Sequence, residues 1–303
     1  MIFKLSKDIK FSYFYKKLNI LSLLFFILSI LILLFNGLNL GVDFKGGTLI
    51  EVRTENSLVR IAEIRQSFLK MNLGDITVKK FGKENDYLVK IEATKSDDEN
   101  FIKSINDKLS TDLGSNVNFR RVENVGPKVS SELLRAGLLA ISLSLAAMLF
   151  YIWIRFEWQF GIGAVLALLH DVLTTIGLFS ILNLEFNLAI VAAILTIAGY
   201  SINDTVVVYD RIRENLRKFR KEDVPSIINM SVNQTLSRTT MTSLTTLLAL
   251  IVLFYFGGEV IHGFVFAMIW GVFIGTYSSI FIASPLLNIF RLGGSEVRND
   301  EKK

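Results

Sequence analysis

Four charged side chains interrupt long apolar stretches of this 303-residue chain. One of them, Arg135, lies one turn from the end of its stretch and can extend to the membrane surface, which leaves three at greater depth. Asp171 stands near the middle of the stretch 160–182, and Asp204 stands in the second half of 188–209. Arg238 follows near the start of the next apolar stretch. Because an ionisable side chain at the centre of a membrane costs about 3 kcal/mol, each of the three is a candidate functional group.

Asp204 and Arg238 could form a proton-dependent pair. Their stretches cross a membrane in opposite directions, which places the two residues at similar depth. A carboxyl group near a guanidinium and the same group far from it differ in proton affinity. Two arrangements with different Asp–Arg distances would therefore bind and release a proton in a cycle. A static ion pair that fixes the helix register explains the same residues equally well, and the residues alone leave both interpretations open.

Further polar side chains accompany these charges. His170, Asp171, Asn203 and Thr242 are candidates for a supporting role in a proton path. Thr242 belongs to a run of hydroxyl side chains that also contains Ser237, Thr239, Thr240, Ser243, Thr245 and Thr246. Such hydroxyls either line a hydrated path for protons or donate hydrogen bonds to backbone carbonyls of their own helix.

Two acids at membrane depth also suggest an intramembrane aspartyl protease. That chemistry needs two carboxyl groups that share one proton. At a helical rise of about 1.5 Å per residue, the depths of Asp171 and Asp204 differ by roughly 9 Å. The Gly-x-Gly-Asp context expected of such proteases is also missing. We therefore expect no enzyme.

The composition narrows the remaining classes. Hydrophobic residues make up 51% of the chain and charged residues 20%, and the mean hydropathy is +0.46, which excludes a purely soluble globule. Three prolines and 24 phenylalanines argue against disorder. The absence of cysteine excludes disulfides, iron–sulfur clusters and thiolate zinc sites, and two histidines leave little for any other metal site. We expect no cofactor and no metal.

Six apolar stretches reach the length of about 20 residues that a membrane span requires. They predict a polytopic α-helical membrane protein with short tails at 1–17 and 291–303. The predicted spans are 18–38, 133–154, 160–182, 188–209, 237–256 and 261–290, the last five forming a membrane domain over 132–290. The first span lacks an Ala-x-Ala cleavage site, so we interpret it as an uncleaved anchor.

The basic residues predict the orientation of these spans. Lysines and arginines gather in both tails and in the segment between the fourth and fifth spans, whereas the short loops 183–187 and 257–260 have none. The positive-inside rule therefore places both termini in the cytoplasm. This distribution also accounts for the net charge of +5, and we expect no nucleic-acid partner.

A charged segment, 39–131, lies between the first two spans. The predicted orientation of the spans places this segment outside the cytoplasm, as a periplasmic domain. Alternating apolar and polar residues predict strands, and longer periodic patterns predict helices. The expected elements are strands at 48–53, 76–81, 87–92 and 117–122, with helices at 58–71 and 97–113. The order β-α-β-β-α-β predicts a small ferredoxin-like α+β domain.

The sixth span carries a small residue at every fourth position. Gly263, Ala267, Gly271, Gly275 and Ser279 form a ridge along one helix face. Such a ridge permits close approach of helices, so we expect a partner helix along its length, in this chain or in another.

The sequence resembles the SecD/SecF family, and within it the SecF branch. The resemblance is carried, in the family's order, by Gly41–Thr48, Val125–Leu133, Arg155–Trp158, His170-Asp171, Gly199–Thr205 through Asp210–Asn215, Ser237–Thr239 and Gly275–Ser278. These stretches are spread over nearly the whole chain.

This resemblance implies one six-span half of an RND-superfamily assembly in the bacterial inner membrane. It implies a complex with SecD that uses the proton-motive force to assist late translocation of unfolded preproteins, beside the SecY-SecE-SecG translocon and a YajC-type accessory subunit. The family's aspartate and arginine tied to proton passage fall on Asp204 and Arg238, which favours the relay over the static pair. The alternatives are a passive scaffold for SecD and the translocon, or a small-molecule RND-type transporter.

Overall fold

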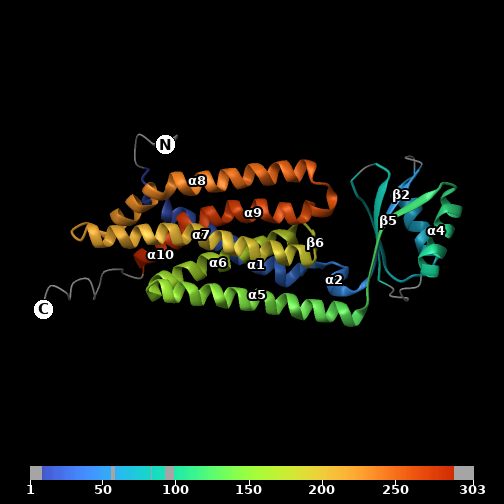
Figure 1. Ribbon diagram of the computed structural model, residues 1–303, viewed down its shortest axis with the longest axis horizontal. Coiled ribbons are helices and arrows are strands. Elements are labelled where there is room, and N and C mark those ends of the chain that lie inside the picture. The colour runs from blue at the N-terminus through green and yellow to red at the C-terminus, as the bar shows by residue number, and fades with distance from the viewer. Residues whose placement is uncertain (1–8, 56–58, 83, 93–98, 290–303) are drawn as a thin grey trace.

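The computed structural model describes residues 9–55, 59–82, 84–92 and 99–289. Within these ranges six helices are long and apolar enough to cross a membrane. They lie along the long axis of the molecule, and an α+β domain stands at one end (Figure 1). We call this the sheet end of the bundle and the opposite end the distal end. The predicted tail 291–303 and the first eight residues of the predicted tail 1–17 lie outside the described residues.

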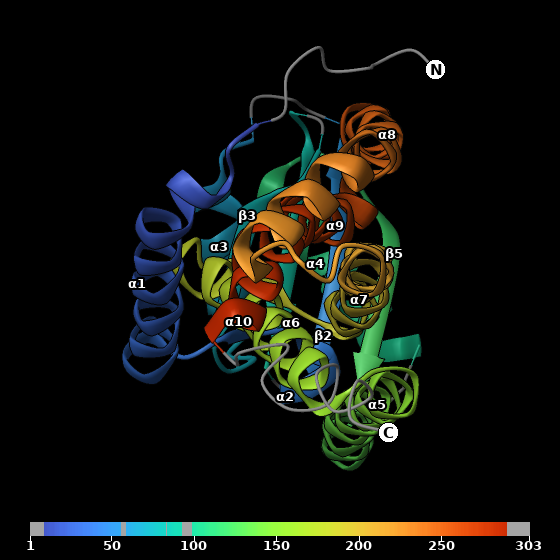
Figure 2. The same ribbon diagram turned by 90° about the vertical axis from the view of Figure 1, so that its left-hand side faces the viewer.

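The membrane bundle consists of three interior helices and three peripheral ones. In the interior helices α6, α7 and α9, more than half of the residues in the most apolar part of the span are buried. Helices α1, α5 and α8 lie around them and are mostly exposed (Figure 2). The helices are α1 (Ser12–Asn36), α5 (Pro127–Arg155), α6 (Trp158–Ile181), α7 (Leu188–Lys218), α8 (Val224–Phe256) and α9 (His262–Ser278), which continues through a π-helical segment, η2 (Ser279–Ala283), into α10 (Ser284–Ile289).

Helices α7 and α8 extend well beyond the spans that hydropathy predicts. Only residues 219–223 separate them, so the basic segment forms the tip of a helical hairpin rather than a long loop. Asp223 caps α8 by accepting a hydrogen bond of 3.3 Å from the amide of Ser226, and Pro225 occupies the first turn. An acid followed by a proline is a helix-start signal that hydropathy does not detect.

The small-residue ridge of the last span packs against α7 of the same chain. A methyl group added at Gly271 would overlap the side chain of Ile197, and one at Gly275 would come within 3.1 Å of the Ser201 side chain. Ala267 is completely buried. The partner helix expected for the ridge is therefore α7.

The α+β domain has the predicted ferredoxin-like topology. Its elements are β2 (Gly47–Thr54), α3 (Ile61–Lys70), β3 (Ile76–Lys80), β4 (Asp86–Ile91), α4 (Glu99–Leu113) and β5 (Val117–Val125). The sheet order β3-β4-β2-β5 is antiparallel throughout. The polytopic helical fold with a small α+β domain after the first span is confirmed. In this domain, the described strand and helix boundaries lie within three residues of those predicted. The start of the helix predicted at residue 97 lies outside the described residues.

The two faces of the sheet have different surroundings. Ile50 and Val52 of β2 are completely buried in the core on the face covered by α3 and α4. The alternate face turns toward the membrane bundle, where Lys90 of β4 donates a hydrogen bond of 2.8 Å from Nζ to the carbonyl oxygen of Leu40. Burial lowers the pKa of Lys90, and the nearby Glu185 opposes this effect. One sheet face therefore holds the domain core and the other faces the bundle.

The contact between α7 and α9 makes Gly271→Ala a test of the bundle. The new methyl group would collide with Ile197, and overpacking of this kind costs about 1–3 kcal/mol. We expect a lower thermal unfolding midpoint for the purified chain in detergent. Gly199→Ala is the matched control, because no atom outside its own helix lies within 4 Å of the added methyl. An equal loss in both variants would contradict this packing.

Candidate functional site

The carboxylate of Asp171 is enclosed in the centre of the bundle. The residue has no exposed surface, and its Oδ2 accepts hydrogen bonds of 2.7 Å from Ser201 Oγ and 2.6 Å from Ser278 Oγ. Its Oδ1 lies 3.0 Å from Nδ1 of His170. Both carboxyl oxygens thus have partners from α6, α7 and α9, as a buried polar group requires.

Asp204 has a looser set of partners. Its Oδ2 accepts one hydrogen bond of 3.4 Å from Thr276 of α9. The Thr276 hydroxyl lies 2.6 Å from that of Ser243 on α8, which in turn accepts a bond of 3.4 Å from Tyr200. Asp204 is only 2% exposed. Its carboxyl group is therefore buried, and its contacts are a series of neutral hydroxyl groups that connects α7, α8 and α9.

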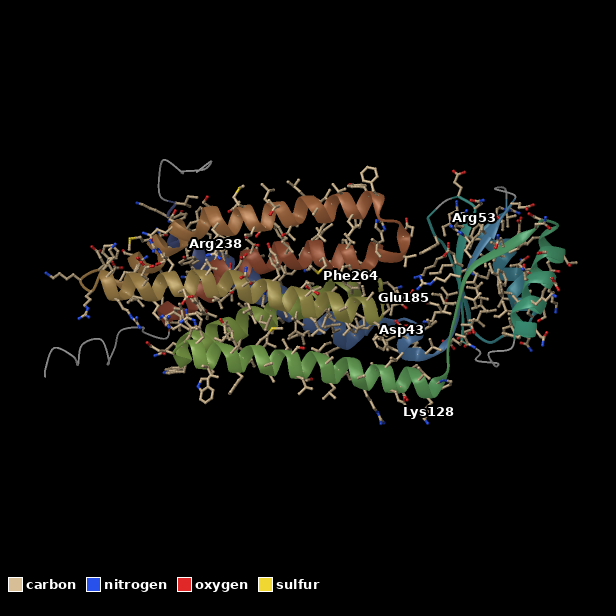
Figure 3. All side chains as sticks on the ribbon, in the orientation of Figure 1. Asp43, Arg53, Lys128, Glu185, Arg238 and Phe264 are labelled. Atoms are coloured by element: carbon tan, nitrogen blue, oxygen red, sulfur yellow. The ribbon has the colours of Figure 1, made fainter. Side chains whose placement is uncertain are left out.

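Arg238 does not contact Asp204. It is exposed on α8 in the distal half of the bundle (Figure 3), and its guanidinium makes no hydrogen bond or ion pair with any described residue. Its charge acts on Asp204 only through the longer-range Coulomb interaction. The structure therefore places the two residues in neighbouring helices without joining them as an ion pair.

The supporting residues fall into two groups. His170 and Asp171 lie in the interior, whereas Asn203 and Thr242 are exposed on the outer faces of α7 and α8, as Arg238 is. These three polar side chains form an exposed polar face at a depth that the flanking apolar stretches assign to the membrane. Polar groups at this depth normally face a protein partner or a water-filled space rather than lipid.

Helices α7 and α9 take part in the contacts of both acids, since Asp171 accepts bonds from both helices and Asp204, on α7, accepts one from α9. On α7, Ser201 lies one turn before Asp204, and on α9, Thr276 and Ser278 lie two residues apart. The π-helical segment η2 begins directly after Ser278. Segments of π-helix are frequent at functional sites, and this one shifts the register of the last span beside the Asp171 carboxylate.

Hydropathy and charge alone did not select the hydroxyl partners of the acids. Ser201, Thr276 and Ser278 carry no charge, and only the need of a buried carboxyl group for donors would have pointed to them. The hydroxyl run on α8 behaves differently. Thr239, Thr242, Thr245 and Thr246 donate to carbonyls about one turn earlier in their own helix, and within the described part of the chain only Ser243 of this run also reaches another helix.

A short segment, residues 37–46, connects this bundle to the sheet domain, and we call it the strap. Its strand β1 (Asn39–Leu40) pairs in parallel with β6 (Glu185–Phe186), which precedes α7. Its short helix α2 (Val42–Lys45) carries Asp43, whose Oδ2 accepts a hydrogen bond of 2.9 Å from the amide of Leu188, the first residue of α7. Asp43 and Glu185 lie together at the sheet end in Figure 3.

Two glycines allow the strap to turn into the sheet. Gly46 and Gly47 have φ values of 78° and 117°, a region that favours glycine. A side chain at Gly47 would also collide with the carbonyl oxygen of Ile91 on the neighbouring strand β4. The strap therefore leads directly from the start of α7 into the central strand β2.

No group of three or more histidine, cysteine or acidic side chains that could hold a metal ion occurs among the residues that the structure describes. The site consists of single carboxylates and hydroxyl donors, which suits the binding and release of protons better than the coordination of a cation.

Comparison with known families identifies this arrangement. Residues 105–292 match the family described as protein export membrane protein SecD/SecF, C-terminal, and residues 31–57 match the SecD/SecF GG motif, which contains the strap. The chain belongs to the SecD/SecF family. As a polytopic protein of this family, it has the six-helix fold and the sheet domain that its sequence resemblance implied.

Similar SecD/SecF-family proteins carry the name protein translocase subunit SecF. One from Rickettsia bellii is 46% identical over 83% of this chain and 83% of its own length, and one from Rickettsia prowazekii is 42% identical over 93% and 91%. The crystal structure of SecDF, a translocon-associated membrane protein from Thermus thermophilus, matches with a TM-score of 0.86 at 35% identity. The match covers 96% of this chain but only 40% of that one.

The two hydrogen bonds to Oδ2 of Asp171 can be tested by removing their donors. Ser201→Ala and Ser278→Ala each remove one of two donors to the same oxygen, and each should cost about 1–3 kcal/mol. The double variant leaves Oδ2 without a donor, so its loss should exceed the sum of the two single losses. Thermal unfolding in detergent measures all three variants, and Ser142→Ala, which removes only an exposed bond within α5, is the control. Additive losses would show that the two serines act independently.

Asp43 generates a second test, at the start of α7. Asp43→Ala removes the acceptor for the Leu188 amide, whereas Asp43→Asn keeps a side-chain oxygen there. Loss of a helix-capping acceptor costs about 1 kcal/mol, so hydrogen exchange in the first turn of α7 should accelerate in the alanine variant and stay near wild type in the asparagine variant. Unchanged exchange in Asp43→Ala would mean that the strap does not hold α7.

Proposed function

We propose that this chain is a SecF-type subunit of the Sec protein-export machinery and, with SecD, uses the proton-motive force to assist late translocation of unfolded preproteins. The observation that carries the proposal is the carboxylate of Asp204, which is buried among neutral hydroxyls, with the guanidinium of Arg238 on the neighbouring helix and not in contact with it. The protein is a transport component and not an enzyme. It needs no cofactor, because the proton gradient is its energy source.

The two membrane acids suit different roles. Asp171 is bonded on both oxygens at 2.6–3.0 Å, which favours a fixed role in positioning α6, α7 and α9. The single 3.4 Å bond of Asp204 is easily exchanged when helices shift. We infer that Asp204 carries the proton and that the structure corresponds to the separated state of the Asp204–Arg238 pair. A paired state requires α7 and α8 to move relative to each other.

Helix α7 provides a direct route from this pair to the sheet domain. Asp204 lies sixteen residues from the first residue of α7, roughly 24 Å at the ideal rise of an α-helix. That first residue is held by Asp43 of the strap, and the strap continues into β2. Rotation or axial movement of α7 would thus displace the strap and, with it, the domain that is expected to meet the exported polypeptide.

Two solved SecDF structures support a cycle with more than one arrangement. The second, described as SecDF in super-membrane-facing form, also has 35% identity to this chain but a TM-score of 0.72 instead of 0.86. The lower TM-score at the same identity supports a different placement of the parts in that form. One charge that crosses about 100 mV supplies about 2.3 kcal/mol, so a few protons would shift such an equilibrium almost completely.

A SecD-type subunit is the partner that fits the exposed polar face. The solved SecDF chain is more than twice the length of the region that matches here, which leaves room for a second half. We propose that SecD covers Asn203, Arg238 and Thr242, in the bacterial inner membrane with both termini of this chain cytoplasmic. The SecY-SecE-SecG translocon, a YajC-type subunit and the unfolded polypeptide are the further partners that we propose.

The alternatives receive less support. The small-residue ridge that motivated a pure scaffold packs inside the chain against α7, so it is not free to hold a partner. An aspartyl protease would need a shared proton between Asp171 and Asp204, yet each binds different hydroxyls. A drug transporter would need a large funnel, whereas the sheet domain is small.

The proposal predicts loss of gradient-driven export when the pair is neutralised. Membrane vesicles that contain Asp204→Asn or Arg238→Met should export a preprotein only at the rate seen without a proton gradient, because the carboxyl or its counter-charge is gone. Co-purification of SecD with each variant must first show an assembled complex. Glu222→Gln, which removes a carboxyl from the exposed hairpin tip, should behave like wild type.

The opposite result is equally clear. If assembled Asp204→Asn and Arg238→Met complexes keep gradient-dependent export, the two residues are structural and the chain serves as a scaffold. If Glu222→Gln is as defective as the other two, the effect of the charge change is not specific to the pair.

A further inference from the structure

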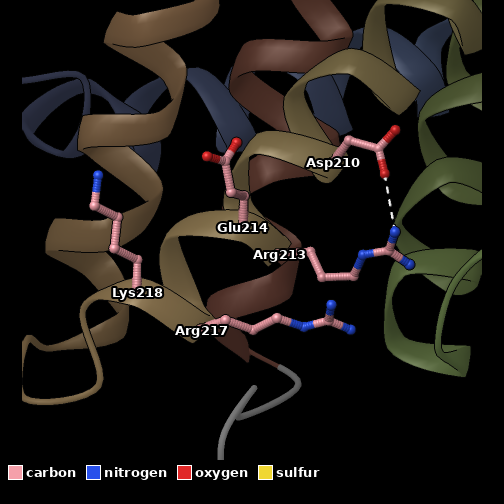
Figure 4. Close-up of a pocket in the computed structure, with 5 residues that line it drawn as sticks. All are labelled: Asp210, Arg213, Glu214, Arg217 and Lys218. Carbon is pink, nitrogen blue, oxygen red and sulfur yellow. Dashed lines mark hydrogen bonds and ion pairs between the residues drawn. The ribbon is translucent and has the colours of Figure 1, made fainter.

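A basic groove lies at the distal end of the bundle, apart from the acids in its centre. It has a volume of about 320 Å³ and is lined by the last three turns of α7 (Figure 4). The lining residues are Asp210, Arg213, Glu214, Arg217 and Lys218. The proton relay proposed above does not use this part of the chain.

Both carboxylates of the groove already have cationic partners. Asp210 is shared between Arg155 at 3.1 Å and Arg213 at 3.3 Å. Glu214 receives a bond of 2.6 Å from Arg211, which belongs to the same turn of α7. The acids of the groove are therefore engaged, and its remaining positive charge is uncompensated.

The uncompensated charge comes from Arg217, and in part from Arg213, which shares the single carboxylate of Asp210 with Arg155. Arg213 and Arg217 are four residues apart on α7, and in Figure 4 their guanidinium groups extend toward the same side of the helix. Arg217 forms no ion pair with any residue in the described part of the chain. Like charges four residues apart destabilise a helix by a few tenths of a kcal/mol, about 0.2–0.5, unless an anion lies between them.

Neighbouring contacts hold this cationic surface in place. The guanidinium groups of Arg155 and Arg213 both lie over the ring of Phe156, at 5.5 and 5.3 Å from its centroid. Arg213 also donates a bond of 3.0 Å to the carbonyl oxygen of Arg155. Lys218 points away from Arg217 in Figure 4, and its Nζ lies 5.4 Å from the centroid of the Phe219 ring, so it does not join the arginine side of the groove.

The groove lies at the depth of the lipid headgroups. About 20 helical residues span a hydrocarbon core of roughly 30 Å, so a span that begins at Leu188 leaves the core near Val208, just before Asp210. Trp153 and Trp158, next to Arg155, are 66% and 56% exposed. Exposed tryptophans are characteristic of membrane–water interfaces.

We propose that this groove binds the phosphate group of an anionic phospholipid, with Arg213 and Arg217 as its principal ligands. Arginine binds phosphate through paired N–H donors, and two guanidinium groups on the same side of a helix can contact the same phosphate. The acyl chains would lie along the exposed apolar residues at the distal ends of α5 and α6. The bound lipid would join α7 to the α5–α6 connection, which is otherwise held there by the Arg155–Asp210–Arg213 contacts.

The experiment compares the full chain in lipid nanodiscs of two compositions, phosphatidylcholine alone and equal parts of phosphatidylcholine and phosphatidylglycerol. We expect a higher unfolding midpoint in the anionic nanodiscs for the wild type. Arg217→Gln should lose most of this increase, and Arg217→Lys should keep part of it. Arg217 makes no contact whose loss would prevent folding, and native mass spectrometry of retained phosphatidylglycerol gives an independent readout for every variant.

Arg220→Gln is the matched control, because it removes the same charge from the adjoining hairpin tip but does not line the groove. It should keep the full increase. Equal losses in Arg217→Gln and Arg220→Gln would show diffuse attraction of a basic loop and would overturn the site. Stabilisation by inorganic phosphate in neutral nanodiscs would assign the groove to a soluble phosphate instead of a lipid. No difference between the two nanodiscs would overturn the proposal altogether.

Discussion

The carboxylate of Asp171 sets the main constraint on the membrane bundle. A charge without access to water is tolerated only if its oxygens receive several hydrogen bonds. The donors come from α6, α7 and α9, so these three helices must pack around one point. Close packing of α7 and α9 is possible only because Gly271 and Gly275 remove the side chains between them. The interior of the bundle therefore follows from one polar requirement and one row of small residues.

Asp204 and the strap depend on this fixed interior. Helix α7 is held near its middle by Ser201 and at its first residue by Asp43, while Asp204 one turn beyond Ser201 keeps only hydroxyl contacts. Asp171 is firmly bonded to α7, whereas Asp204 on the same helix is loosely bonded. Helix α7 can therefore respond to a change at Asp204 without losing its packing. The parallel pairing of β1 with β6 then extends any displacement into the sheet domain.

The sequence allowed accurate prediction wherever local patterns decide structure. Alternating residues such as Ile50 and Val52 defined the strands, and uninterrupted apolar stretches defined the spans, because burial on one face or on all faces leaves a periodic trace. The contacts of Asp43 with Leu188 and of Asp171 with Ser278 leave no such trace, since their partners are more than a hundred residues away. Similar depth for Asp204 and Arg238 stays a prediction, and depth does not specify which way a side chain faces around the helix axis.

The outward orientation of Arg238 has a physical consequence for the whole assembly. Asn203, Arg238 and Thr242 place an amide, a cation and a hydroxyl on the outside of a bundle whose remaining exterior is largely apolar. Lipid cannot solvate these groups, so they must face other protein or water. A bundle with its structural acid inside and its cation outside is therefore incomplete by itself. In the proposed cycle, the counter-charge of Arg238 comes either from Asp204, when it moves toward Arg238, or from the protein surface that covers this face.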